Sequence, residues 1–372
     1  MNRAIRIALV LAIVGWGAVL ATRSTARLSS IAAATPRGTT GGATASAQAA
    51  TAAGAFLATL DAKLKSKAQL ELRTNLRARW SNLPTGVPMQ ADRGRSGGPF
   101  ERNGVSLGEL TRAQQDAALA VVAAALSRAG YQKVLDIVTA DQVLEETVGP
   151  TRPPQNRVKF GRAEYHLAIL GTPSSSQPWM IQFGGHHLAV NLTMVGPTSV
   201  LTPSHTGTQP TTYTRDGRTV RPLGREEDKG LALMTALEPE QQKQATLAYS
   251  VADLVVGAGE DGKVIQPEGV RATGLNRGQQ DRLVDLISEW VTILNDAEAA
   301  AKMLDVRSNL SNTYFAWSGP VTKEGGAYFR IQGPTVLIEY APQRSRGDDG
   351  LPDHIHTLYR DPTNDYAARL VR

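Results

Sequence analysis

Hydrophobic and polar positions along the chain follow two periods, and the change from one to the other separates helical from extended segments. Within 110–129, four apolar residues recur at the three- and four-residue spacing of an amphipathic helix: Leu119, Val122, Leu126 and Ala129. Thr111 is placed to cap the start of this helix and Gly130 to follow its end. Later segments, such as "WMIQFGG" and "VLIEY", are instead typical of β-strands.

These patterns predict the same succession of elements twice. In the first half we expect helices at 54–80 and 111–129, then strands at 164–171, 178–184, 186–195 and 199–202. In the second half we expect helices at 231–256 and 276–304, with Asn276 as a cap, then strands at 312–318, 326–332, 335–341 and 354–360. Pro- and Gly-rich loops at 84–99, 202–224 and 342–353 are placed to line a cleft.

Three pairs of segments also resemble each other in the same order along the chain. The segment "FLATLDAKLKSKAQL" resembles "LMTALEPEQQKQATL", and "GVSLGELTRAQQDAAL" resembles "GVRATGLNRGQQDRLV" at a constant offset of 165. The segment "WMIQFGGHHLAVNL" then resembles "YFRIQGPTVLIEY", which is one residue shorter. Ordered self-similarity indicates an internal duplication. The predicted class is therefore α+β, with two pseudo-equivalent halves, each of two helices followed by antiparallel strands.

The N-terminus has the composition of an export signal. A short basic stretch, "MNRAIR", precedes an apolar run of 15 residues at 7–21, which is short for a membrane span of about 20 residues and fits a signal-peptide core. Arginines at 23 and 27 leave an uncleaved anchor open. We therefore predict a signal peptide or anchor at 1–28, a flexible linker at 29–54, and two halves at 55–225 and 226–372. The expected location is extracytoplasmic: periplasmic, secreted or anchored.

Charge and cysteine content remove several classes of function. The net charge of +6 comes largely from five arginines within 1–54, and the rest of the chain carries 35 basic and 34 acidic residues. Nucleic-acid binding requires a basic face, so we expect no nucleic-acid partner and membrane contact only through an uncleaved N-terminus. The chain has no cysteine, which excludes disulfides and thiolate chemistry. It also contains no nucleophile elbow, Walker loop, dinucleotide fingerprint or zincin helix.

Adjacent histidines stand out in "GGHHLAVNL", because the chain has six histidines in total. Strand alternation places His187 on the same face as Asn191 and puts His186 on the opposite face. One interpretation makes His187 a metal ligand or base, with His186 and Asn191 as catalytic groups. The other makes His186 a histidine at the edge of the core and His187 a surface residue. The pattern alone leaves both open.

Further along the chain, a second pair of histidines and a lone acid strengthen the metal interpretation. His354 and His356 lie on one face of an extended strand, about 7 Å apart, which suits two imidazoles on one ion. Glu339 lies in an apolar strand, where a carboxylate needs a partner or a metal. We therefore predict one divalent transition metal (zinc, iron or copper) held by His187, Glu339, His354 and His356. Arg360 is predicted to hold a small-molecule or anionic substrate at the mouth of the cleft.

Several other histidines and acids receive weaker assignments. His205 lies in a Pro/Gly-rich stretch, where exposure or a supporting role is expected rather than ligation. His166 is expected to be structural, and Glu226 is a minor additional candidate for a ligand.

Specific blocks of the sequence resemble the family called domain of unknown function 3500. They are "WSNLP", "PWMIQFGGHHLAVN", "IEY" and "HIHTLYRDPTNDY", and the resemblance covers most of the chain after residue 55. It implies an exported protein of bacterial type and brings no settled activity. Chains of this kind usually end in "DYG" and a late histidine, whereas this one ends in "DYAARLVR", which removes one potential ligand.

Three functions follow from these observations. The first is an extracytoplasmic metal-dependent enzyme, most simply a hydrolase that uses a metal-bound water. The second is a non-catalytic module whose two halves clasp a ligand. The third is a metal-dependent oxidative enzyme, because two histidines and a carboxylate also suit iron or copper.

Overall fold

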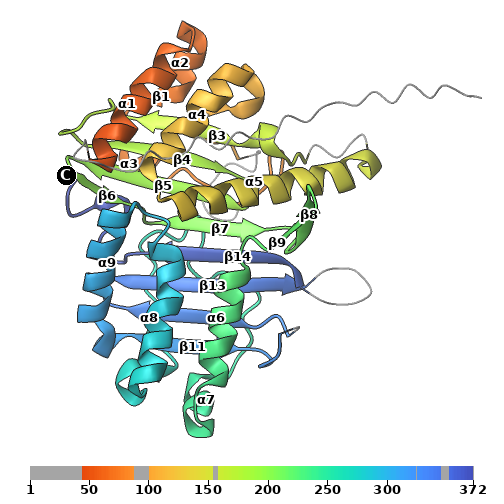
Figure 1. Cartoon of the computed structure of the whole chain (residues 1–372), viewed down its shortest axis with the longest axis vertical. Helices are drawn as coiled ribbons and strands as arrows, with labels where there is room; N and C mark the ends of the chain where they lie inside the picture. Colours follow the sequence, from red (N-terminus) through yellow and green to blue (C-terminus); the bar gives the residue numbers. More distant parts are fainter. Residues whose placement is uncertain (1–43, 88–99, 154–157, 324, 345–351, 372) are drawn as a thin grey trace, which may run out of the picture. The chain divides into compact units, whose positions relative to one another are not determined.

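The computed structural model describes residues 44–87, 100–153, 158–323, 325–344 and 352–371. Their fold is mixed α+β, as the sequence predicts, with helices packed on one large sheet (Figure 1). The predicted signal or anchor at 1–28 lies outside the described residues. Among the described residues, no helix is long and apolar enough to cross a membrane.

The first half of the chain contributes five helices and nine strands among the residues described. In chain order they are α1 (Ala45–Ala58), α2 (Ala62–Ala68), β1 (Gln69–Leu70), α3 (Thr74–Arg77), β2 (Val105–Ser106), α4 (Arg112–Ala125), α5 (Arg128–Val148), β3 (His166–Leu170), β4 (Trp179–Gly185), β5 (Leu188–Val195), β6 (Thr198–Val200), β7 (Ser204–Thr208), β8 (Tyr213–Arg215) and β9 (Arg218–Val220).

In the second half, the elements follow in a similar order. They are α6 (Gly224–Thr235), α7 (Pro239–Ala245), β10 (Val270–Arg271), α8 (Arg277–Val291), α9 (Asp296–Ser308), β11 (Tyr314–Ser318), β12 (Tyr328–Gly333), β13 (Val336–Arg344) and β14 (Pro352–Arg360).

Twelve of the strands form one sheet, and the two halves of the chain meet at its centre. The strand order is β1-β3-β4-β5-β7-β14-β13-β12-β11-β10, with β2 paired to β3 and β6 paired to β5. Antiparallel pairing of β7 with β14 makes the junction, where Thr206 lies opposite Thr357 and their hydroxyl oxygens are 2.6 Å apart. From this junction outward, three antiparallel strands follow in each direction, β5, β4 and β3 on one side and β13, β12 and β11 on the other.

The sheet is covered differently on its two faces. Helices α6, α8 and α9 lie side by side over the strands of the second half (Figure 1), and the Trp290 indole N–H in α8 donates to the Thr357 hydroxyl. Residues of β14 that alternate with Thr357 point to the opposite face, which irregular segments cover. There Trp80, Val256 and Leu358 share a buried apolar cluster. The candidate site lies on this second face.

Equivalent registers occur in the two central hairpins. In β4–β5, Gly185 pairs with Leu188 across a two-residue turn, and Gln182 pairs with Asn191. In β12–β13, Gly333 pairs with Val336 and Arg330 with Glu339. The two hairpins therefore have the same length from turn to polar pair. Counted back from the turn, Tyr328 takes the place of Met180 rather than of Trp179, so the one-residue difference between the two quoted segments lies at their start and not within the hairpins.

The predicted elements differ from the observed ones mainly at helix ends. Thr111 and Asn276 cap α4 and α8 as predicted, each in a reciprocal capping box. Residues 45–54, predicted to be part of a flexible linker, instead belong to α1, whose Ala49 and Ala53 are buried. Gly130 lies in the first turn of α5 rather than after α4.

Long predicted helices break where a polar cap interrupts them. The predicted helix at 276–304 divides at Asn295, whose side chain accepts the Glu298 N–H and starts α9. The predicted helix at 231–256 ends at Ala245, and the one at 54–80 divides into α1, α2 and α3. Strand β7 was predicted as loop, and it is the strand that joins the two halves.

Candidate metal centre

Five of the six histidines gather beside the junction of the two halves. His186 and His187 form the two-residue turn between β4 and β5, and His205 lies in β7. His354 and His356 lie on one face of β14. Four pairs of ring centroids connect them: His186–His187 at 3.5 Å, His187–His354 at 4.5 Å, His187–His356 at 5.3 Å and His205–His356 at 5.4 Å. The pairing of β7 with β14 thus brings histidines from both halves into one cluster.

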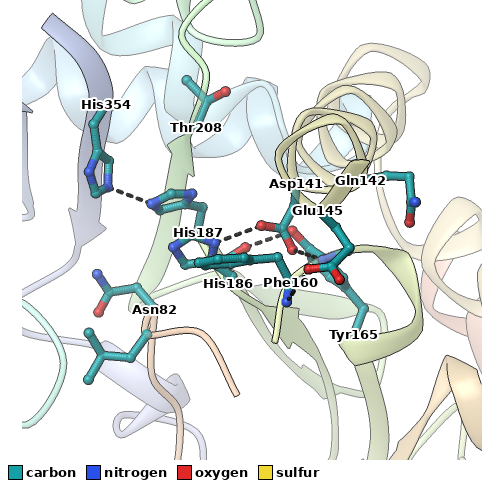
Figure 2. A network of polar contacts seen from close by, with 12 residues as sticks. Asn82, Asp141, Gln142, Glu145, Phe160, Tyr165, His186, His187, Thr208 and His354 are labelled. Carbon is teal, nitrogen blue, oxygen red and sulfur yellow. Dashed lines mark hydrogen bonds and ion pairs between the residues drawn. The ribbon is translucent and has the colours of Figure 1, made fainter. Parts of the chain in front are cut away.

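Three of these imidazoles converge on one point. The Nε2 atoms of His187 and His354 are 2.6 Å apart, and those of His354 and His356 are 2.9 Å apart. Figure 2 shows the rings of His187 and His354 pointing toward each other. Nitrogens bound to one ion at about 2.0–2.1 Å would be separated by roughly 2.9 Å at right angles or 3.3 Å at tetrahedral angles. The His354–His356 separation matches ligands at right angles, the His187–His354 separation is shorter than either value, and the three side chains together could hold one ion.

Ring separations give a second test of the same arrangement. Two imidazoles on one ion have centroids about 4.5 Å apart at right angles and about 5.2 Å apart at tetrahedral angles, given metal–nitrogen bonds near 2.0–2.1 Å. The His354 ring lies 4.5 Å from both the His187 and the His356 rings, and the latter two are 5.3 Å apart. All three separations fit a shared ion. The His186 and His187 rings, 3.5 Å apart, are closer than ligands at right angles would be, although Asp141, His186 and His187 form a second group whose ligand atoms all lie within 4.8 Å of one another.

The backbone at His187 is held in an unusual conformation. Its φ is +64°, in the left-handed region that costs a residue with a Cβ roughly 1–2 kcal/mol. Two hydrogen bonds from outside the hairpin hold it there. The His187 N–H donates to the Asn82 carbonyl at 3.1 Å, and the Gly207 N–H donates to the His187 carbonyl at 2.7 Å. Such strain, held by surrounding contacts, is typical of functional positions.

Gly207 supplies the space that the cluster occupies. A Cβ at this position would lie 2.7 Å from the Ile355 carbonyl oxygen and 3.1 Å from ring atoms of both His187 and His205. These distances are tighter than ordinary van der Waals contact. Glycine is therefore required in β7 so that the imidazoles can approach one another.

Burial keeps the histidines in the neutral form that binds metals. Burial lowers the pKa of His187 well below its usual value, and the neighbouring His186 and His354 add to the effect. Burial, followed by the charge of His356, lowers the pKa of His354 to about 3. The same causes lower the pKa of His205. A neutral imidazole has a free nitrogen lone pair, which is the state required of a ligand.

Carboxylates orient two of the histidines from outside the three-nitrogen group. Asp253 Oδ1 lies 2.8 Å from His356 Nδ1, and Asp141 Oδ1 lies 2.6 Å from His186 Nδ1. The pairing of Asp141 with His186 is visible in Figure 2. A carboxylate on one ring nitrogen fixes the tautomer and makes the other nitrogen more basic. Asp253 therefore directs Nε2 of His356 toward the group.

Glu339 is the one predicted ligand that lies outside the three-nitrogen group. It is fully buried, and its carboxylate accepts hydrogen bonds from the N–H groups of Val255 and Val256 and from the Tyr328 hydroxyl. Burial raises its pKa, and these three donors oppose that effect. The isolated acid that the sequence assigned to a metal is thus satisfied by protein donors.

The predicted catalytic residues differ in their positions. His186 lies against His187 in the cluster. Asn191 is buried in β5, four residues after His187, where it accepts from Gln182 and donates to the Pro203 carbonyl. Arg360 is also buried, and its guanidinium binds Asp261 and Asp365. The predicted anion clamp is therefore occupied by two protein carboxylates.

A polar cavity of about 320 Å³ adjoins the cluster. It is lined by Asn82, Asp253, Leu254, Val255, Gly257, Ala258, Glu260 and Lys263. Two of these residues also contact His356, because the Asn82 amide lies 3.5 Å from its Nε2 and Asp253 binds its Nδ1. A molecule in this cavity would therefore lie next to the imidazoles.

Three important residues were missed or underestimated from the sequence. His205 is fully buried, and neither of its ring nitrogens has a hydrogen-bond partner in the part of the chain that the structure describes. Asp253 lies on an irregular segment, and no local pattern marks it. Asp141 does carry a signal, since it lies on the buried stripe of α5 with Ile137 and Leu144. An acid at such a position requires a buried partner.

Comparison with known proteins agrees with the resemblance found in the sequence. The chain matches no curated protein and no solved structure. A family model described as a protein of unknown function (DUF3500) matches residues 42–368, which include every element from α1 to β14. With nearly its whole length matched, the chain belongs to the DUF3500 family.

Proposed function

We propose that this protein is a metal-dependent enzyme, most simply a hydrolase, in which His187, His354 and His356 hold one divalent transition metal. The observation that carries the proposal is the convergence of three imidazole nitrogens, with Nε2 separations of 2.6 and 2.9 Å. A neutral imidazole has one N–H, so three nitrogens meeting at one point cannot all satisfy one another by hydrogen bonds. A bound ion accepts all three lone pairs.

Three protein ligands leave coordination positions for water and substrate, which is the pattern of catalytic rather than structural sites. A bound zinc ion would supply a nucleophile by lowering the pKa of a coordinated water toward about 7. His186, fixed by Asp141, would exchange protons next to the ligands. His205 would offer a second buried nitrogen beside His356. These residues replace the catalytic roles that the sequence assigned to Asn191 and Arg360.

The proposed substrate is a small polar molecule that occupies the cavity beside His356. Half of the residues that line the cavity have polar or charged side chains: Asn82, Asp253, Glu260 and Lys263. Lys263 is the cationic group of this lining, where it donates to the Val255 carbonyl and pairs with Glu260. An anionic substrate would approach Lys263 and not Arg360.

A metal-dependent oxidative enzyme is the second candidate. The ring separations of 4.5 Å from His354 to both neighbours are those of ligands at right angles. Two of the three ligand pairs at right angles suit six-coordinate iron better than tetrahedral zinc, whereas the 5.3 Å separation of His187 and His356 is that of tetrahedral angles. The identity of the bound metal therefore separates the two candidates.

Elemental analysis of the purified full-length protein tests the proposal. We expect close to one equivalent of zinc, iron or copper, and we expect His356→Ala to lose most of it. His166→Ala is the matched control, because His166 lies in β3 outside the cluster. A wild-type protein that neither retains nor takes up a divalent metal would remove both enzyme candidates and leave the ligand-binding module.

We also propose that the two halves, 55–225 and 226–372, arose by internal duplication. Support comes from the equal lengths of the β4–β5 and β12–β13 hairpins and from the matching capping boxes that start α4 and α8. The pair Gln114 and Gln279 supplies the reciprocal bond in both boxes. Structural superposition of an experimental model tests this, with a shared path through both hairpins and both helix pairs as the expected result.

Export is proposed on the sequence of the N-terminus alone. The basic start, the apolar run at 7–21 and the absence of acidic residues within 1–54 support a signal peptide or anchor at 1–28 and an extracytoplasmic location. The flexible linker would then run from 29 to the start of α1. N-terminal sequencing of protein from its natural host tests this, since recovery of Met1 in a soluble cytoplasmic fraction would contradict export.

A further inference from the structure

An irregular segment between α7 and β10 forms one wall of the candidate site. Residues 253–261 are here called the wall segment. They include Asp253, which contacts His356, and five further residues that line the adjacent cavity. Val256 at its centre is fully buried and packs against Trp80 and Leu358. The wall segment has no regular secondary structure of its own, so its position depends on side chains of the sheet.

Glu339, in strand β13 of the sheet, binds the backbone of the wall segment. Its two carboxylate oxygens accept the N–H groups of Val255, at 2.9 and 3.1 Å, and of Val256, at 2.9 Å. The Tyr328 hydroxyl, at 2.6 Å, holds the carboxylate from the neighbouring strand. Two consecutive backbone N–H groups are therefore fixed two residues after Asp253.

Arg360 holds the same segment from its other side. Its Nε donates to the Val256 carbonyl at 2.9 Å, and its Nη2 donates to the Gly257 carbonyl at 3.1 Å. Asp261 at the end of the wall segment and Asp365 both bind its Nη1. Glu339 accepts hydrogen bonds from backbone N–H groups, and Arg360 donates hydrogen bonds to backbone carbonyls. Both the donors and the acceptors of the backbone between Val255 and Gly257 therefore have side-chain partners.

We propose that Glu339 and Arg360 are positioning residues of the metal centre, which act by holding the wall segment so that Asp253 orients His356. This inference rests on the proposed metal site. Its physical basis is that a carboxylate on the outer nitrogen of a ligating histidine fixes ring orientation and raises basicity, and loss of such a partner typically weakens metal binding about 10- to 100-fold. The sequence analysis assigned direct roles to these two residues, Glu339 as a metal ligand and Arg360 as an anion-binding group, in place of this indirect one.

The experiment is a titration of metal-free, full-length protein with Zn²⁺ in the presence of a competing chelator. Asp253→Asn, which removes the carboxylate but keeps the size, should weaken Zn²⁺ binding about 10- to 100-fold. Glu339→Leu, which leaves the Val255 and Val256 N–H groups without an acceptor, should weaken it by a similar factor. Glu339→Gln keeps one acceptor oxygen and should recover part of the affinity.

A double variant separates positioning from general loss of stability. If Glu339 acts through Asp253, then Glu339→Leu added to Asp253→Asn should change Zn²⁺ affinity by less than about twofold, because coupled residues are not additive. The intensity of the d–d absorption of bound Co²⁺ should change in the same variants, since it reports coordination geometry. Full additivity of the two substitutions would overturn the inference.

Glu289→Leu is the matched control. Glu289 is a buried acid with two cationic partners, Arg225 and Lys229, on the helices that cover the other face of the sheet. Its loss should lower the thermal midpoint and leave Zn²⁺ affinity within about twofold. If the wild type binds no metal, the proposed function fails; if it binds and Glu339→Leu binds equally well while folded, this inference alone fails.

Discussion

The two central hairpins share one backbone plan and carry different chemistry. Both β4–β5 and β12–β13 close with a two-residue turn, and both place a polar pair three residues behind it. The turn of the first hairpin is His186-His187, whereas that of the second is Pro334-Thr335. The first hairpin thus supplies one candidate ligand, His187, and the second hairpin supplies none of the three.

The polar pairs of these hairpins perform a common task by different means. Gln182 donates to the Arg77 carbonyl at the end of α3, and Glu339 accepts from Val255 and Val256 in the wall segment. Each pair therefore holds a neighbouring segment against the same face of the sheet. The first segment brings Asn82 to His356, and the second brings Asp253. An amide pair suffices where the attached group is neutral. A carboxyl group is the acceptor where the Asp253 carboxylate must be held beside a histidine.

Replacing His187 should have the largest effect, because it removes the contribution of the first hairpin to the three-nitrogen group. His187→Asn suits the left-handed backbone at φ +64°, which Asn tolerates better than most residues. We expect the bound metal to fall from about one equivalent to near zero by elemental analysis, with an unchanged circular dichroism spectrum. Full retention of metal would show that the second half alone holds the ion.

Filling the space at Gly207 tests the junction between the hairpins. Gly207→Ala places a Cβ within 3.1 Å of both His187 and His205 and within 2.7 Å of the Ile355 carbonyl. We expect a loss of about 1–3 kcal/mol in the free energy of unfolding, together with weaker metal binding. Gly54→Ala is the control, since nothing lies within 4 Å of its added Cβ in helix α1, and alanine there should stabilise by roughly 0.5–1 kcal/mol.

Replacing Asn191 tests whether the Gln182–Asn191 pair of the first hairpin supports the metal centre in the way proposed for Glu339. Asn191→Leu deletes hydrogen bonds to Gln182 and the Pro203 carbonyl, and buried partners left unsatisfied cost about 1–3 kcal/mol. We expect lower stability in urea unfolding and Zn²⁺ affinity within about twofold of wild type, unlike Glu339→Leu. Equal losses of Zn²⁺ affinity in Asn191→Leu and Glu339→Leu would mean that the polar pairs of both hairpins position the metal centre.

The smallest expected effect is on the pH dependence of the free energy of unfolding, to which His166 of the first half contributes. His166 begins β3 where Tyr314 begins β11, and burial, followed by the charge of Arg102, lowers the pKa of His166 to about 4. The folded state favours the neutral ring, so its contribution to stability is complete above about pH 6.5 and is lost as pH falls toward 4. Between pH 7.5 and 5, His166→Asn should lose on the order of 1 kcal/mol less stability than wild type in urea unfolding.

Much of the fold is readable from local pattern. Strands β3, β4, β5, β11, β12 and β13 lie within a few residues of their predicted positions, because alternating or continuous apolar runs mark buried strands wherever they pair. The caps Thr111 and Asn276 were also predicted, since a capping box depends on residues three apart. Helices that end at an internal cap, as at Asn295, were joined because apolar spacing continues through the break.

Candidate ligands were identifiable by residue type and spacing, but their partners were not. His354 and His356 share a face because strand periodicity dictates it. Asp253 meets His356 across 103 positions of sequence, and only the packing of the wall segment creates that contact. Glu339 was assigned to a metal because a buried acid needs compensation, and the sequence could not distinguish a cation from two backbone N–H groups.

The sequence by itself determined the α+β class, the paired hairpins, the family resemblance and the histidines as candidate ligands, all of which depend on residue type and short-range periodicity. Tertiary structure decided that β7, a polar segment predicted as loop, pairs with β14 and carries His205 into the cluster. The reason is physical: a strand of Ser, His, Thr and Gly has little apolar pattern to mark it. Its place in the sheet comes from long-range hydrogen bonding to strands that are themselves buried.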